Sequence, residues 1–208
     1  MTPEHIIFIP TIFLLGLLTG ILISVRRTGG GTAVLVTLGI ALSVFVLNHL
    51  TPIPTGVVAL HNITGGQPIF DQSPSFDSAE VLARLDAFGA EGRVLYQRFT
   101  YTGDLLFPLT VLLFLLAFAR FSARQLAHTA IWIRLLAILP IAWFAFDMLE
   151  NTLVFSLIAA FPDEMPALAA ILGPVTAIKF LLLPTSLIAQ FVGLFVALVK
   201  STRTRSAV

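Results

Sequence analysis

The chain has 208 residues, of which 57% are hydrophobic and only 11% charged, and its mean hydropathy is +0.97. This balance excludes an ordinary soluble domain and predicts an all-α integral membrane protein, with residues 1–208 forming a single membrane domain. Cysteine is absent, which excludes disulfides and thiolate metal sites, and the net charge is only +1.

The first two apolar segments are each long enough, or nearly so, to cross a bilayer. About 20 helical residues, at about 1.5 Å each, span the hydrocarbon core. Residues 6–25 are closed by Arg26 and Arg27, and residues 33–50 are stopped by Pro52 and Pro54. The glycine-rich turn between the two segments predicts an antiparallel pair of transmembrane helices.

Residues 51–103 form the one sizeable segment expected outside the membrane. Their first part is rich in glycine and proline and is predicted to be loop. The second part begins with Asp77-Ser78-Ala79-Glu80, which has the form of a helix capping box, and apolar residues then recur at helical spacing with a break near Gly89 and Gly92. We predict two short amphipathic helices, the second running into the third span. They are interpreted as a packed lid on the bundle, with a partner-docking or membrane-sensing surface as the alternative.

Three further apolar segments follow this region. Residues 104–120 end at Arg120 and Arg124, and residues 131–160 and 167–199 are long enough to cross with tilt or to continue beyond the membrane. Together with the first two segments they predict five transmembrane helices.

The distribution of basic residues predicts the orientation. Lysine and arginine collect at one set of alternate span ends, where no acidic residue lies, and the positive-inside rule makes those ends cytoplasmic. The N-terminus is therefore expected outside, the C-terminus inside and residues 51–103 extracytoplasmic. The basic residues are Arg26, Arg27, Arg120, Arg124, Arg134, Lys200, Arg203 and Arg205.

Each of the last three apolar segments carries charged residues. They are Asp104 in the third span, Asp147 and Glu150 with neighbouring Asn151 in the fourth, and Lys179 in the fifth. A charge at bilayer depth costs roughly 2.5–3.5 kcal/mol on insertion scales, so these side chains are expected to face the bundle interior and to find partners there.

The connecting loops predict which of these residues lie at equal depth, because antiparallel helices place residues equidistant from the loop centre side by side. The loop centred near position 164 places Glu150 opposite Lys179, and the loop centred near 125–127 places Asp104 opposite Asp147 and Glu150. The first turn brings two residues of the second span to a comparable depth. The predicted ligand or ion cluster contains Asp104, Asp147, Glu150, Asn151 and Lys179, with Asn48 and His49 as further members.

Charge balance in this layer suggests its chemistry. Carboxyl groups in excess over one ammonium cannot all be ionised cheaply in a low dielectric, so a carboxyl keeps a proton or a bound cation supplies the missing charge. This favours a membrane protein that binds or relays a proton, a cation or a small polar ligand.

Two other functions remain open. The layer could be structural or belong to an accessory subunit with a membrane-protein partner, or an intramembrane enzyme could use Asp147 or Glu150 as general acid or base beside Lys179. Asp104, Asp147, Glu150 and His49 carry donors suited to a metal, but the paired Glu-x-x-His motifs of di-metal bundles are absent, so no metal site is predicted. No cofactor is indicated, the lipid bilayer is the expected partner, and no nucleic acid is expected.

The stretch Leu82 to Tyr96, followed by Asp104-Leu105-Leu106-Phe107-Pro108, then Phe146 to Asn151 and the single Lys179, resembles a group of small, uncharacterised bacterial multi-pass membrane proteins. The likeness covers roughly residues 78–182. It implies a bacterial cytoplasmic (inner) membrane and suggests that the polar residues belong together, but it implies no activity. The inward Asp and Glu are also similar to a pair in the four-helix membrane fold of sterol isomerases and the sigma-2 receptor, with a different order and spacing. That fold serves as the template for the enzyme alternative.

Overall fold

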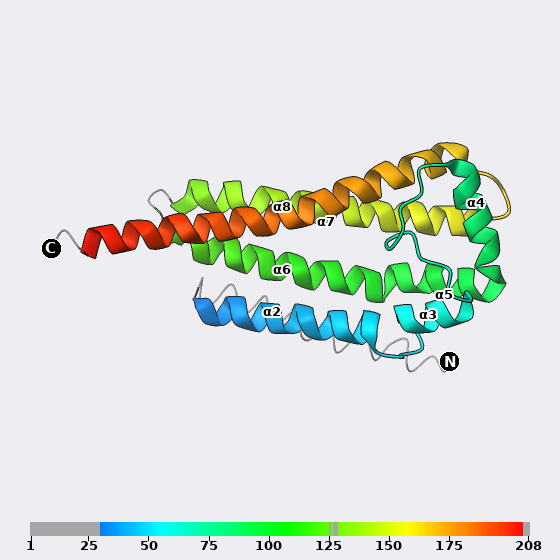
Figure 1. Cartoon of the computed structure of the whole chain (residues 1–208), viewed down its shortest axis with the longest axis horizontal. Coiled ribbons are helices and arrows are strands. Elements are labelled where there is room, and N and C mark those ends of the chain that lie inside the picture. The colour runs from blue at the N-terminus through cyan, green and yellow to red at the C-terminus, as the bar shows by residue number, and fades with distance from the viewer. Residues whose placement is uncertain (1–29, 125, 127–128, 206–208) are drawn as a thin grey trace.

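A computed structural model describes residues 30–124, 126 and 129–205 of the protein (Figure 1). Every regular element in this described part is helical. The elements are α2 (Gly31–Phe45), a π-helical turn η1 (Val46–Leu50), α3 (Val57–Ile63), α4 (Ser78–Ala87), α5 (Gly89–Tyr101), α6 (Gly103–Arg124), α7 (Thr129–Ala160) and α8 (Pro166–Arg205).

Four helical stretches in the described residues are long and apolar enough to cross a membrane. They are Gly31–Leu50, Gly89–Arg124, Ile131–Ala160 and Pro166–Val196. The structure supports four of the five expected spans. The predicted first span, residues 6–25, lies outside the described residues and stays a prediction.

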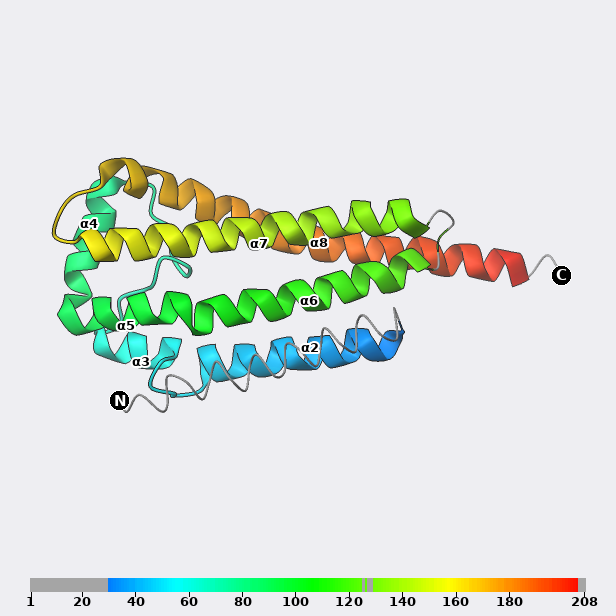
Figure 2. The same cartoon turned by 180° about the vertical axis from the view of Figure 1, so that it is seen from behind.

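The long helices run side by side along the length of the molecule, and the cap segment, residues 51–101, gathers at one end (Figure 1). Helix α2 packs against α6, α6 also contacts α7 and α8, and α7 and α8 pack against each other. Figure 2 shows the same order from behind, with α8 extending past its neighbours at the end opposite the cap segment.

The prediction that the first part of the cap segment is loop is wrong in one place, because the helix α3 lies within it. Val57 and Leu60 of this helix are buried. The helix was not predicted because its seven residues are too few to show a clear helical period in the sequence. Gly56 permits the close packing, since a Cβ there would lie 2.8 Å from the carbonyl oxygen of Asn48.

The two predicted helices of the cap segment are present as α4 and α5. The Asp77 carboxylate accepts a hydrogen bond from the Ala79 amide (3.0 Å) and caps α4. Glu80 does not complete the capping box; it pairs instead with Arg84, 2.5 Å away on the next turn.

The break between α4 and α5 falls at Gly89, whose φ of 65° favours glycine. Gly92 lies inside α5 and does not break it. A Cβ at Gly92 would lie 2.9 Å from the Thr64 methyl group, so this glycine lets α5 approach the end of α3.

Helix α5 continues into α6 with only Thr102 between them, as the sequence predicted. The junction is held from the side by η1, because the Asn48 amide donates to the Gly103 carbonyl oxygen (2.8 Å). A Cβ at Gly103 would lie 2.7 Å from the Phe99 ring, so only glycine fits this contact without a shift.

The main apolar core lies between the cap segment and the adjoining ends of α7 and α8. Phe70, Phe88, Tyr96 and Phe99 from the cap segment join residues of α7 and α8 in this core. The Phe70 amide donates to the Tyr96 hydroxyl (3.0 Å), and the Phe70 ring lies against those of Phe88 and Tyr96. The cap segment is therefore packed as a lid on the bundle, and the loop between α3 and α4 is drawn inward.

Candidate functional site

Lys179 of α8 stands among three carboxyl groups from different parts of the chain. Its Nζ donates to Glu150 Oε2 of α7 and to Asp71 Oδ1 of the loop between α3 and α4, and it lies 3.4 Å from Asp147 Oδ1 of α7. We call these four residues the Lys179 cluster. The contact between Glu150 and Lys179 is the one that the loop geometry predicted.

Helical spacing explains why the two helices present these groups together. Asp147 and Glu150 are three residues apart on α7, and Thr176 and Lys179 are three apart on α8, so each pair projects from one face. Thr176 donates its hydroxyl hydrogen to Glu150 Oε1. Glu150, Asp147 and Lys179 are 0%, 5% and 6% exposed, which places the charges within the protein interior.

Asp71 is the member that sequence reasoning missed. It lies in a loop more than a hundred residues from Lys179 along the chain, so neither helical spacing nor counting from a loop centre relates the two. The available signal was the preceding pair Ile69 and Phe70, two large apolar residues in a polar loop, both of which are buried. Their burial carries Asp71 inward, leaving its side chain 18% exposed.

The charge state of Asp71 follows from its surroundings. Burial by itself raises the pKa of this carboxyl, but the Lys179 ammonium and hydrogen bonds within the cluster more than offset it, so the pKa of Asp71 lies below its ordinary value. Asp71 is therefore ionised at neutral pH and acts as a fixed counter-charge to Lys179.

Asp104 lies close to this layer but outside the described ion pairs of Lys179. It is buried near the start of α6, and the Asn151 amide of α7 donates to its backbone carbonyl (3.1 Å). Asp104 Oδ2 and Asp147 Oδ2 are both buried without a hydrogen-bond partner among the described residues. Two carboxyl oxygens in the layer thus remain available to a proton or an ion.

The two asparagines predicted in the cluster hold backbone instead. Pro108 has no N–H, so the Asp104 carbonyl four residues earlier loses its helical donor. Asn151 supplies the replacement across the α6–α7 interface. The Asn48 side-chain amide donates to the carbonyl oxygen of Gly103, the residue that precedes Asp104. Both amides position the site rather than contact Lys179.

His49 lies in an aromatic environment. Its ring stacks on Phe45 with centroids 4.8 Å apart and meets the edge of the Phe107 ring at 5.1 Å. Its Nδ1 is 3.3 Å from the Phe45 carbonyl oxygen. The described contacts of His49 are thus with rings and its own helix.

The carboxyl groups close enough to hold a metal include Asp71, which is not among the donors named from the sequence. Asp71, Asp147 and Glu150 offer oxygens within 4.8 Å of one another, whereas Asp104 and His49 stand outside that group. The Lys179 ammonium already contacts all three carboxyls. A metal ion at the same point would meet strong repulsion from this ammonium.

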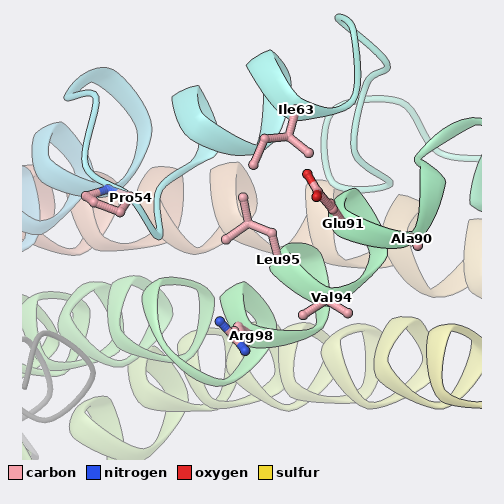
Figure 3. Close-up of a pocket in the computed structure, with 7 residues that line it drawn as sticks. All are labelled: Pro54, Ile63, Ala90, Glu91, Val94, Leu95 and Arg98. Atoms are coloured by element: carbon pink, nitrogen blue, oxygen red, sulfur yellow. The ribbon is translucent and has the colours of Figure 1, made fainter. Parts of the chain in front are cut away.

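A surface groove of about 590 Å³ lies apart from the cluster, between α3 and α5 (Figure 3). Ile63 of α3 faces Leu95 of α5 across it, with Glu91 and Arg98 at its polar edges. No member of the Lys179 cluster lines this groove.

Comparison with protein-family models, with curated proteins and with solved structures finds no match for this chain. The sequence and the described structure together establish an all-helical protein with four candidate membrane-spanning helices and a buried cluster of carboxyl groups around one lysine.

Proposed function

We propose that this protein is a multi-pass membrane protein that binds and relays a proton, or a small cation in its place, through the Lys179 cluster and Asp104. One observation carries the proposal. Four carboxyl groups crowd into a buried layer with a single ammonium, and two of their oxygens have no partner among the described residues.

The charge balance favours an exchangeable positive charge. Lys179 offsets about one negative charge, and its Nζ is committed to Glu150 and Asp71. Asp104 and Asp147 remain, each with a buried and unpartnered oxygen. An uncompensated buried charge is strongly destabilising, so these two carboxyls take up a proton or a cation.

A proton fits this site better than a metal ion. It needs no coordination shell and can bind a carboxyl oxygen beside an ammonium, whereas a divalent ion would compete with Lys179 for the same three carboxyls. Asp71 supports a route of entry, because it is the one cluster member outside the candidate spans and its side chain is partly exposed.

The orientation of the bundle completes the proposal. Arg120, Arg124 and Arg134 lie on helical segments at the end opposite the cap segment (Figure 1). Asp163 and Glu164, in the loop between α7 and α8, lie at the cap end. This asymmetry supports a cytoplasmic C-terminus, an extracytoplasmic cap segment and, with the resemblance noted above, a bacterial inner membrane.

Infrared spectroscopy of the protein in lipid bilayers tests the proposal directly, because a protonated carboxyl has its own absorption band. At neutral pH we expect such a band, diminished in Asp147→Asn or Asp104→Asn. Asp163→Asn, which removes an exposed carboxyl, is the matched control and should leave the band unchanged.

Repeating the spectra without and with Na⁺ or K⁺ separates the two bound species. A band that weakens on adding one of these ions supports the cation form of the proposal. If no band is found in either condition, or all variants give the spectrum of the parent, the cluster holds no exchangeable charge and the proposal is overturned.

Proton movement separates the proposal from the structural alternative. If the cluster relays protons, Asp71→Asn should slow proton entry into vesicles containing a pH-sensitive dye about tenfold or more, in line with the contribution of positioned acid–base groups. A purely structural cluster would leave Asp71→Asn and the exposed control Asp86→Asn at the same rate.

A further inference from the structure

A second group of buried polar side chains lies nearer the end of the bundle opposite the cap segment. It consists of Ser122 of α6 and Ser186 and Gln190 of α8, all 0% exposed. Ser186 and Gln190 follow Lys179 by seven and eleven residues, so all three project from one face of α8. The inward face of α8 thus carries two polar sites, the Lys179 cluster and this second group.

The side-chain amide of Gln190 has a determined orientation. Pro140 of α7 has no N–H, so the Leu136 carbonyl four residues earlier is left without its helical donor. Gln190 Nε2 donates to that carbonyl oxygen (2.8 Å), which only the NH₂ end of the amide can do. Gln190 Oε1 is thereby turned to a buried position where it has no partner among the described residues.

Ser186 departs from the usual behaviour of serine and threonine in this bundle. Its hydroxyl is buried and has no hydrogen-bond partner in the described part of the chain, so it is free for another partner. Other helical hydroxyls donate to the carbonyl four residues earlier, namely those of Thr37, Ser43, Thr152, Ser156 and Thr185.

Three helices meet at this point. The Ser122 hydroxyl donates to the backbone carbonyl oxygen of Gln190 (3.5 Å). A Cβ at Gly193 would lie 3.2 Å from Leu136 and 3.7 Å from Ser122, so the glycine brings α8 close to both α6 and α7. An acceptor on Gln190 and hydroxyls on Ser186 and Ser122 therefore share one interhelical junction.

We propose that Ser122, Ser186 and Gln190 bind an internal water molecule and form a second station for the proton that the Lys179 cluster takes up. Buried polar groups normally find protein or water partners, and a water can donate to Gln190 Oε1 while it accepts from Ser186. This inference rests on the proposed function.

The transfer itself leaves the station unchanged. Ser186 Oγ takes the incoming proton and gives its own hydroxyl hydrogen to the water, and the water gives one of its hydrogens to Ser122 Oγ, which passes its hydroxyl hydrogen on. Each O–H bond that breaks is replaced by one that forms, so the water and both serine hydroxyls are regenerated, while Gln190 Oε1 only orients the water. Ser186 and Gln190 lie about 10 Å and about 16 Å beyond Lys179 along α8. Buried Trp143 lies on α7 one turn from Asp147.

Solid-state NMR on glutamine-labelled protein in bilayers tests the bound water without any assay of activity. Magnetisation should pass from water to the Gln190 side-chain amide, whose signal is identified by its loss in Gln190→Met. If the buried Gln190 amide receives no magnetisation from water while the exposed Gln72 amide does, the water site is refuted.

Ser186→Ala tests the role in proton movement. The Ser186 hydroxyl has no protein partner among the described residues, so its removal should leave the fold intact, and we expect parental thermal stability with proton entry into vesicles slowed about tenfold or more. Thr185→Ala, at the adjacent exposed and self-bonded position, is the matched control and should keep the parental rate.

The two proposals fail in distinguishable ways. The carboxyl infrared band of the Lys179 cluster should be the same in Ser186→Ala and the parent, because the second station lies apart from that cluster. A retained band with parental proton entry in Ser186→Ala overturns the second station alone. Absence of the band in the parent overturns the proposed function, and with it the second station, which depends on it.

Discussion

At the scale of single residues, the Lys179 ammonium balances the carboxyl groups of the site in the part of the chain that the structure describes. Asp71, Asp147 and Glu150 all lie within ion-pair distance of its Nζ. Replacing a buried ion pair as a whole can be nearly neutral, whereas removing one partner leaves the other charge uncompensated. The energetic role of Lys179 therefore depends on which partners are present.

Lys179→Met should lower the free energy of unfolding in detergent by about 3–5 kcal/mol, because it leaves buried carboxyls without a counter-charge. Adding Glu150→Gln should restore part of that loss, and Arg98→Met, which removes an exposed cation, should have little effect. Thermal or denaturant unfolding of the four proteins makes the comparison. Parental stability of Lys179→Met would show that Lys179 does not neutralise this layer.

Asp71 gives a prediction for pH dependence. Its pKa in the folded protein lies below the unfolded value, so its contribution is fully present above the unfolded value of about 4 and is lost as the pH falls through the folded value. Asp71→Asn should cost about 1.5–3 kcal/mol, as for a charged hydrogen bond, at any pH above that window.

Unfolding of the parent and Asp71→Asn between pH 7 and pH 2 measures this difference. The two stabilities should run parallel above about pH 4 and converge below it, with Asp86→Asn as the exposed control. A gap that persists unchanged to the lowest pH would contradict the ion pair between Asp71 and Lys179.

At the scale of helices, prolines and amides are matched across interfaces. Pro108 frees the Asp104 carbonyl, which Asn151 binds, and Pro140 frees the Leu136 carbonyl, which Gln190 binds. Prolines are tolerated in membrane helices when a neighbouring group satisfies the freed backbone atom. Each amide therefore joins two helices at a fixed register.

A double-mutant cycle tests the pairing of Pro140 with Gln190. Gln190→Met should destabilise the parent by about 1 kcal/mol, within the range of interhelical hydrogen bonds in membranes. In a Pro140→Ala background the restored N–H satisfies the Leu136 carbonyl, so the same change should cost less than half as much. Equal costs in the two backgrounds, measured by unfolding in detergent, would show that Gln190 does not replace the missing proline donor.

At the scale of the whole molecule, the cap segment and the clustered arginines define two chemically different ends. The proposed orientation places the cap segment outside the cell and the start of α2 at the cytoplasmic end. The natural chain contains no cysteine, so single introduced thiols report their position without background labelling.

Asn62→Cys, at an exposed position of α3, should react with a membrane-impermeant thiol reagent on intact cells. Thr32→Cys, exposed near the start of α2, should react only after the membrane is permeabilised. The reverse pattern would invert the proposed topology, and labelling of both positions on intact cells would place the two ends on the same side.

Local patterns in the sequence sufficed for much of this architecture. Membrane class, the positions of the four described spans and the helices α4 and α5 follow from apolar run length, helical period and capping residues, which depend on neighbours in the chain. The contact between Glu150 and Lys179 was also predictable, because a short loop makes depth a matter of counting residues from its centre.

Other features depend on packing between distant segments and were decided only by the tertiary structure. Asp71 joins the site because Phe70 buries its ring against Phe88 and Tyr96, a contact that no local pattern encodes. The prolines are visible in the sequence, but which amide satisfies each freed carbonyl depends on how the helices face one another. The sequence thus determined how far along the bundle each charge lies, because this position follows from helix length. Tertiary packing decided which side chains contact the charges, because a contact depends on how each helix is rotated about its axis and how closely the helices approach.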